Sequence, residues 1–149
     1  LEEYDAINIL CDKVPDAIGS YVDAVRVGNL LFLSGKGPRK ADGEYIKGRL
    51  GKDLTVQEGY DAARLTGLIQ LAVLKKELGS LKKVKRVVKV NGYVRSDDEF
   101  SDQPKVINGF SDLMISVFGN MGKHARTALG TNSLPLGMAV EVEMVVELN

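Results

Sequence analysis

The chain has 149 residues, of which 20 are basic and 20 are acidic, so its formal net charge is zero at pH 7. Zero net charge argues against functions that need a strongly basic surface, such as tight binding to duplex nucleic acid. A single Cys and a single His exclude an internal disulfide, a multi-Cys metal site and a poly-His metal centre. The composition, 44% apolar and 27% charged, is typical of a globular chain, and the length predicts one domain over residues 1–149.

Three features of the sequence bear on where the protein works. No unbroken apolar run is longer than that at residues 30–33, which is far shorter than the ~20 residues that cross a bilayer. The first twenty residues carry five acidic side chains against one basic side chain, which is unlike a signal or transit peptide. A lone Cys fits a reducing compartment, so we expect a cytoplasmic protein that does not enter a membrane.

The first part of the chain predicts a β-hairpin. Residues 1–20 favour a short helix or coil that ends near Pro15. Residues 21–27 and 30–34 are strand-like runs separated by Gly28-Asn29. Two turn-forming residues between two such runs are typical of a tight hairpin connection.

A long helix follows a charged, glycine-rich stretch. Residues 39–53 leave room for one short strand around residues 45–46. Thr55 and Glu58 then form a capping-box pattern, and Gly79 is the expected C-cap glycine. Apolar residues recur between these caps at three- and four-residue spacing, so they share one helical face.

The second half of the chain predicts one more helix and three strands. The strands cover residues 84–94, 126–130 and 138–148, and the helix begins at Asp102 and stops at Gly119. The resulting order is βββαβαββ, which predicts an α+β domain with two helices on one face of a sheet.

The last predicted strand has two different faces. One face is apolar, and the other carries Glu141, Glu143 and Glu147. The apolar face must pack on the helices, and the other face would ordinarily be left to water. Because Leu31 and Leu33 also lie on strands of this single-layer sheet, we expect another subunit to cover the second face.

Most other candidate features favour ordinary structural roles. His124 is interpreted as a loop residue that is solvated or caps a backbone group, rather than as a catalytic base. Residues 34–37 are interpreted as a strand-terminating turn, because they lack the spacing of a phosphate-binding loop. The basic run over residues 75–89 is interpreted as a solvated surface, because aromatic residues for base stacking are scarce there.

Arg126 and Glu141 form the most informative pair of charges. If their strands pair or lie near one another, an Arg and a carboxylate converge at one sheet face. An Arg can grip a substrate carboxylate bidentately, and a Glu can orient or deprotonate a water molecule. An ordinary cross-strand ion pair is the alternative, and the commoner meaning of such a pair.

Several segments together resemble one known family. They are residues 17–21, residues 27–30 with Ser34-Gly35, residues 106–108, Arg126-Thr127, Leu134-Pro135 and residues 140–143. In this pattern the chain resembles the Rid family (reactive intermediate deaminase, also called YjgF or L-PSP), from about Ala17 to its end. The predicted order of helices and strands agrees with this resemblance.

The resemblance implies a chorismate-mutase-like fold with a mixed sheet, assembled as a homotrimer whose sheets form a central barrel. It implies pockets between subunits, a small carboxylate as ligand, and neither cofactor nor metal. The activity implied is hydrolysis of reactive enamines and imines, such as 2-aminoacrylate and 2-imino acids, to 2-keto acids and ammonia.

The resemblance also implies roles for individual residues. Arg126 matches the residue that binds the substrate carboxylate, and Glu141 matches the acidic residue that positions the attacking water. The remaining matched positions line the pocket or follow the Arg: Tyr21, Ser34, Gly35, Asn108 and Thr127.

The chain departs from the typical family pattern in composition and length. Ser20 stands where Pro is usual, Lys36 where Gln is usual, and Ala128 where Cys is frequent. Residues 39–53 and 97–106 are longer than in the typical deaminase, as in a longer-loop subgroup whose members have no settled activity. Three alternatives therefore stay open: a non-catalytic trimer that binds small carboxylates, an RNA- or translation-related role, and hydrolysis of another small carbonyl-like substrate.

Overall fold

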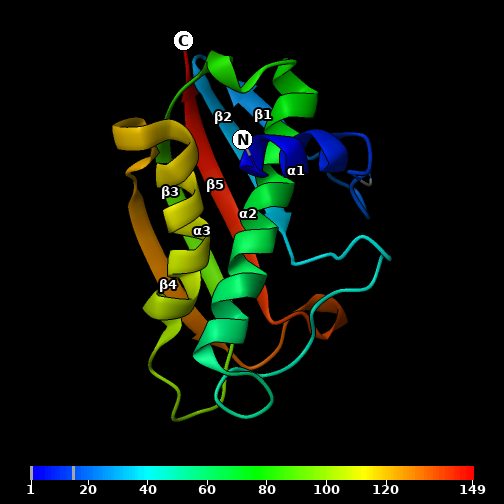
Figure 1. Ribbon diagram of the computed structural model, residues 1–149, viewed down its shortest axis with the longest axis vertical. Coiled ribbons are helices and arrows are strands. Elements are labelled where there is room, and N and C mark those ends of the chain that lie inside the picture. Colours follow the sequence, from blue (N-terminus) through cyan, green and yellow to red (C-terminus); the bar gives the residue numbers. More distant parts are fainter. Residues whose placement is uncertain (1, 15) are drawn as a thin grey trace.

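The computed structural model describes residues 2–14 and 16–149, so the predicted end of the first segment at Pro15 lies outside the described residues. Figure 1 shows α2 and α3 side by side across one face of the sheet. The elements in chain order are α1 (Glu2–Cys11), β1 (Ala24–Val27), β2 (Leu30–Lys36), α2 (Val56–Leu78), β3 (Val84–Arg95), α3 (Gln103–Phe118), β4 (Ala125–Thr131) and β5 (Val140–Leu148).

The sheet is mixed, and its strand order is β1-β2-β5-β3-β4. β1–β2, β2–β5 and β5–β3 pair antiparallel, whereas β3 and β4 pair parallel. The parallel pair follows from the helix between them, because a helical crossover returns the chain in the same direction. β5 therefore lies between β2 and β3, so the last strand in the sequence is the central strand of the sheet.

Two of the expected elements differ from the prediction. Residues 45–46 form no strand: Tyr45 makes an isolated bridge with Arg39, and Lys47 makes another with Met138. Gly43 and Gly48 take positive φ values of 90° and 130°, so the chain turns on both sides of Tyr45 before a ladder can extend. α1 is a regular helix that packs on α2, so the described residues contain three α-helices and five strands instead of the predicted two helices and six strands.

The core lies between the helices and one face of the sheet. On β5 the alternation is as predicted, because Val140, Val142 and Val146 are fully buried while the intervening residues are partly exposed. The caps of α2 are also confirmed. Thr55 Oγ1 accepts from the Glu58 amide, a Glu58 carboxylate oxygen accepts from the Thr55 amide, and Gly79 closes the helix with a φ of 82°.

α2 and α3 approach each other at the level of their backbones. A Cβ atom added at Gly109 of α3 would lie 2.0 Å from the carbonyl oxygen of Tyr60 in α2. Beside this crossing, the Tyr60 hydroxyl donates to Asp112 at 2.8 Å. The close crossing fixes α3 against α2, and thereby fixes the residues that α3 presents to β4.

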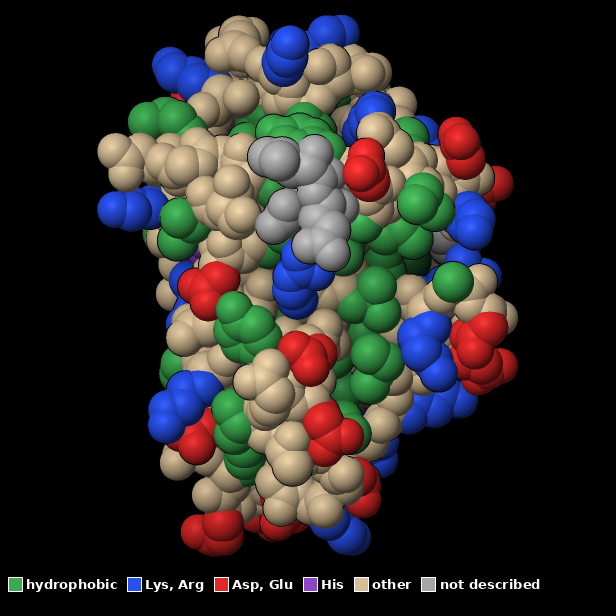
Figure 2. All heavy atoms as spheres, in the orientation of Figure 1, with side chains coloured by type: hydrophobic (Ala, Val, Ile, Leu, Met, Phe, Trp, Pro, Cys, Tyr) green, Lys and Arg blue, Asp and Glu red, His purple; other side chains and the backbone are tan. Residues whose placement is uncertain are grey.

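None of the helices in the described residues is long and apolar enough to span a membrane. Figure 2 shows acidic and basic side chains interspersed over the helical face of the molecule, without a large area of one sign.

The close crossing of the helices generates a prediction about stability. We expect Gly109→Ala to lower the free energy of unfolding by about 1–3 kcal/mol, because the new methyl group forces two backbones apart. Urea denaturation measures the effect. Lys105→Ala, at an exposed position on the same helix, is the control and should change stability by no more than ~0.5 kcal/mol. Equal stability of the two variants would contradict the backbone contact.

Candidate functional site

Arg126 is held against α3 by neutral acceptors. Its Nη1 donates to Asn108 Oδ1 at 2.8 Å and to Ser111 Oγ at 3.2 Å, and its Nη2 donates to the Pro104 carbonyl at 3.4 Å. Partial burial lowers the pKa of Arg126, and the Asp112 carboxylate opposes that shift. An Arg keeps its charge at neutral pH, so α3 fixes a cation at the edge strand β4.

His124 stands behind this Arg as part of a hydrogen-bond chain. Its Nδ1 lies 2.6 Å from the Gly122 carbonyl, so Nδ1 carries the proton. Its Nε2 lies 2.8 Å from Ser111 Oγ and accepts the hydroxyl proton, which leaves the Ser111 lone pairs to accept from Arg126. Burial lowers the pKa of His124, and nearby Arg126 lowers it further, while the bond to the Gly122 carbonyl raises it.

Within the described residues, His124 therefore caps a backbone carbonyl, as the sequence interpretation held, and also supports Arg126 through Ser111. The sequence reasoning missed Ser111. Its position three residues after Asn108 is the available signal, because residues at that spacing lie on the same helical face.

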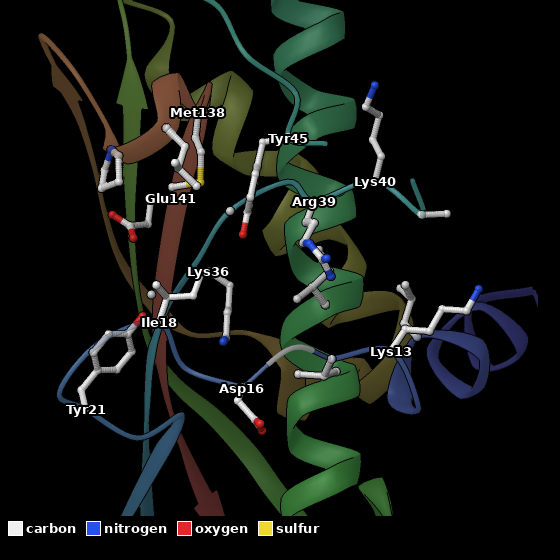
Figure 3. Close-up of a pocket in the computed structure, with 18 residues that line it drawn as sticks. Lys13, Asp16, Ile18, Tyr21, Lys36, Arg39, Lys40, Tyr45, Met138 and Glu141 are labelled. Carbon is white, nitrogen blue, oxygen red and sulfur yellow. The ribbon is translucent and has the colours of Figure 1, made fainter. Parts of the chain in front are cut away.

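A second group of residues surrounds Glu141. Tyr21, Gly35 and Glu141 line one cavity of about 560 Å³ (Figure 3). A Cβ atom at Gly35 would lie 3.1 Å from Glu141 Oε1, so any side chain at that position would crowd the carboxylate. The Ser34 hydroxyl next to it donates to the Val22 carbonyl at 2.6 Å, which ties β2 to the segment that carries Tyr21.

A buried amide produces the local shape of β2 at this point. The β2–β5 register shifts between Leu33 and Lys36, where β2 holds one more residue than β5. Gln70 of α2 is fully buried, and its Nε2 donates to the carbonyls of Ser34 and Val142, both at 2.9 Å. Gln70 therefore satisfies one carbonyl on each strand at the bulge, and sequence reasoning gave no sign of this role.

The environment of Glu141 favours its protonated form. Burial raises the pKa of Glu141, and the like charge of Glu143 raises it further. Glu143 is itself held by Asn91 at 3.3 Å and by the Tyr93 hydroxyl at 2.9 Å, and that hydrogen bond raises the pKa of Tyr93. When ionised, a carboxylate whose pKa is raised is a better proton acceptor than an ordinary one.

The two groups do not meet within one chain. β4 pairs with β3 and not with β5, so the condition under which Arg126 and Glu141 would converge is not met. Arg126 lies opposite Val90, which is buried under the helices, whereas Glu141 lies opposite Tyr93, three residues further along β3. Because side chains alternate between faces, Arg126 and Glu141 project from opposite faces of the sheet.

Thr127 belongs to the open face, because it lies opposite Asn91, which in turn lies opposite Glu143. Its hydroxyl accepts from Lys89 Nζ at 3.2 Å. In the part of the chain that the structure describes, no group of three or more His, Cys, Asp or Glu residues is arranged to hold a metal ion.

Comparison with known proteins identifies relatives over almost the whole chain. Residues 5–148 match the family model described as YjgF/chorismate mutase-like, putative endoribonuclease. The protein TCP17 of Trypanosoma cruzi is 47% identical over 141 residues, which cover 92% of this chain and 88% of that protein. A 2-iminobutanoate/2-iminopropanoate deaminase of Dermatophagoides farinae is 31% identical over 133 residues, which cover 89% and 88% of the two chains.

The fold also has close structural neighbours. The crystal structure of a protein of unknown function from Agrobacterium tumefaciens superposes with a TM-score of 0.85 and 38% identity. The superposition covers 99% of this chain and 94% of that one, so nearly every element described above has a counterpart there.

The burial of Glu141 generates a prediction about stability and pH. Its folded-state pKa is raised above the ordinary value of 4.5, so the folded state binds the proton more tightly than the unfolded state. The contribution of Glu141 to stability should therefore fall as pH rises from about 4 through the raised value. We expect Glu141→Gln to be more stable than wild type at pH 7 and to lose this advantage near pH 4, as measured by thermal unfolding.

Glu147→Gln is the matched control for that experiment, because Glu147 lies on the same face of β5 and has Lys85 Nζ at 4.0 Å. It should gain no stability at pH 7. A Glu141→Gln variant that is less stable than wild type at pH 7 would contradict the penalty assigned to burial of this carboxylate.

Proposed function

The chain belongs to the YjgF/chorismate mutase-like family, and from that membership and the geometry of its site we propose that it hydrolyses reactive 2-imino acids and 2-aminoacrylate to 2-keto acids and ammonia. The observation that carries the proposal is the state of Arg126. Among the described residues its hydrogen-bond acceptors are an amide, a hydroxyl and a backbone carbonyl, so its positive charge stays available to a substrate anion.

The guanidinium is oriented as well as charged. Asn108 and Ser111 together use the two hydrogens of Nη1. The Nε hydrogen, which has no partner among the described residues, and the outer Nη2 hydrogen remain as a fork for a substrate carboxylate. Fixing the carboxylate also fixes the neighbouring imine carbon, and such positioning lowers the activation free energy by about several kcal/mol.

Glu141 is the proton acceptor in this mechanism. The reacting form is the protonated imine, which 2-aminoacrylate reaches by taking up a proton at its terminal carbon. A water molecule beside Glu141 attacks the imine carbon: its oxygen forms the new C–O bond, the C=N π electrons move to nitrogen, and Glu141 takes one of the water protons. The carboxylic acid returns that proton to nitrogen, the C–N bond breaks, and ammonia leaves as the carbonyl forms. Loss of the remaining hydroxyl proton completes the 2-keto acid, so the reaction consumes one water and needs no redox partner.

The mechanism requires a second copy of the chain, because Arg126 and Glu141 project from opposite faces of one sheet. A homotrimer with pockets between subunits supplies it: each pocket takes Arg126 and Asn108 from one subunit, and Glu141, Tyr21 and Gly35 from the next. Such a head-to-tail contact closes into a ring when repeated.

The open face of the sheet supports this assembly. It carries exposed apolar side chains, which monomers seldom display together on one surface. They are Val25, Val27, Phe32 and Leu129, exposed by 52%, 61%, 44% and 51%. In the trimer these side chains would face the other subunits across a central barrel.

The two main alternatives use the same residues differently. A non-catalytic trimer would keep the carboxylate grip of Arg126 and make no use of Glu141 as a base. An RNA-related role would rely on the basic run at residues 75–89, but Lys75 is bonded to Asn8, Lys76 lies 4.0 Å from Asp16, and Lys85 lies 4.0 Å from Glu147.

The mechanism predicts different consequences for the two charged residues. With 2-aminoacrylate or an imino acid generated in situ, we expect Arg126→Ala to abolish the acceleration of its decay, because the substrate is no longer held. Glu141→Gln should lower turnover by about 10²–10⁴-fold while 2-keto acid binding is retained. Arg26→Ala, on the hairpin, is the control. Normal turnover by Arg126→Ala would remove the mechanism, and binding without turnover in wild type would favour the non-catalytic trimer.

The assembly predicts complementation between inactive variants. When Arg126→Ala and Glu141→Gln are unfolded together and refolded at equal amounts, random mixing places an intact Arg beside an intact Glu in about one quarter of the pockets. We therefore expect about a quarter of wild-type activity to return, compared with each variant refolded alone. No recovery in mixed trimers, verified by mass, would contradict a pocket shared between subunits.

A further inference from the structure

The cavity beside Glu141 is much larger than the proposed reaction needs. A 2-imino acid with a two- or three-carbon skeleton beyond its carboxylate has only a handful of heavy atoms. The cavity measures about 560 Å³, which falls within the ~300–1,000 Å³ of pockets that hold drug-sized ligands. The volume beyond Glu141 therefore has room for a substantial substrate side chain.

The lining of that volume is mostly apolar. Side chains from α1, the segment after it, α2 and the chain before β5 contribute to it: Leu10, Val14, Ile18, Ile69, Leu136 and Met138. Leu136 adopts a φ of 58°, a left-handed conformation that is uncommon for a residue with a side chain. A cavity with such an apolar lining binds aliphatic or aromatic groups in preference to water.

A short turn of the chain brings two polar groups to the far part of the cavity. Arg39 and Tyr45 are antiparallel bridge partners, and the bonds Lys40 N–Glu44 O and Ile46 N–Pro38 O flank the bridge at 2.8 and 3.0 Å. Directly opposed residues of an antiparallel pair project on the same side. Figure 3 shows the ends of the Arg39 and Tyr45 side chains directed into the space between the labelled residues, on the other side of Lys36 from Tyr21 and Glu141.

Of the cationic side chains that line this cavity, Arg39 is directed into it and has no partner of opposite charge among the described residues. Lys36 is already paired with Asp23 at 2.7 Å, with both side chains only 12% exposed. Lys40 lies 4.0 Å from Asp42 and points away from the cavity in Figure 3. Among the described residues, the partly buried Arg39 guanidinium has neither a hydrogen-bond nor an ion-pair partner.

We propose that this cavity binds the side chain of the substrate, and that the preferred substrate is an imino acid with an extended apolar side chain ending in an anionic group that Arg39 and Tyr45 bind. The inference rests on the proposed function for the position of the reacting end, at Glu141. The apolar middle of the side chain lies against Ile18, Ile69 and Met138. Lys13 also lines the cavity, but its ammonium end points away from Arg39 and Tyr45 in Figure 3.

The test uses 2-keto acids as stable probes of the same pocket. Pyruvate, 2-oxohexanoate and 2-oxoadipate separate the two features of the side chain, because the last two share a length and differ by one carboxylate. By isothermal titration, 2-oxohexanoate should bind more tightly than pyruvate, and 2-oxoadipate about tenfold more tightly than 2-oxohexanoate, which corresponds to ~1.4 kcal/mol.

Two pairs of variants locate these preferences in the structure. Arg39→Met should remove the preference for 2-oxoadipate over 2-oxohexanoate, whereas Arg26→Met, an Arg on the hairpin outside the cavity, should keep it. Ile18→Trp fills the apolar part and should remove the preference for long side chains. Ile9→Trp is its control, because Ile9 is similarly exposed, at 60% against 74%, and does not line the cavity.

The outcomes separate this inference from the proposed function. Equal affinity for all three probes, or an unchanged 2-oxoadipate preference in Arg39→Met, would overturn the inference. If the imine of pyruvate is also hydrolysed as fast as the longer imines, the deaminase stands and the side-chain pocket does not. If 2-oxoadipate binds in an Arg39-dependent way and no imine is hydrolysed, the pocket stands and the deaminase falls.

Discussion

The shape of the site depends on one buried amide. Gln70 places its NH₂ group between the carbonyls of Ser34 and Val142, and so supports the extra residue that β2 holds opposite β5. Because of that residue, Gly35 lies against Glu141 while Lys36 reaches Asp23. The arrangement has a cost, since Gln70 Oε1 is buried without a partner among the described residues, and such a group costs about 1–3 kcal/mol. Two satisfied backbone carbonyls offset it, and an apolar residue at this position would leave both unpaired.

The sheet keeps Arg126 and Glu141, the two residues of the proposed mechanism, apart. An Arg and a Glu on one face of neighbouring strands would pair with each other and leave neither free for a substrate. Here Arg126 projects toward α3 and is oriented by Asn108 and Ser111, while Glu141 projects from the other face with the like charge of Glu143 near it. In the proposed trimer the two side chains come from different subunits and meet only through the substrate that lies between them. Burial of the exposed apolar side chains on the open face, among them Val25, Val27 and Phe32, would stabilise that assembly.

Local patterns in the sequence predicted local structure well. The hairpin turn, both caps of α2 and the alternation of β5 depend on neighbouring residues, and each is present. The order of strands in the sheet depends on contacts between distant segments, so the sequence did not show that β3 separates β4 from β5. The resemblance to the family pointed to Arg126 and Glu141, but it did not show that their side chains project from opposite faces of the sheet. Ser111 and Gln70 were missed because their roles appear only when α3 meets β4 and when α2 meets the bulge.

The loop between β2 and α2 is attached to the rest of the fold at several points. The Ala139 amide donates to Ile46 at 3.0 Å, the Leu50 amide donates to Arg95 at 2.8 Å, and Leu50 is completely buried. Gly37 admits the Met138 side chain so closely that a Cβ there would lie 2.1 Å from the sulfur. A loop pinned at these points holds Arg39 and Tyr45 at a set distance from the sheet. In the proposed mechanism the sheet and α3 supply the groups that react and the loop supplies those that select. Substitutions in the loop would then alter substrate choice without displacing Arg126 or Glu141.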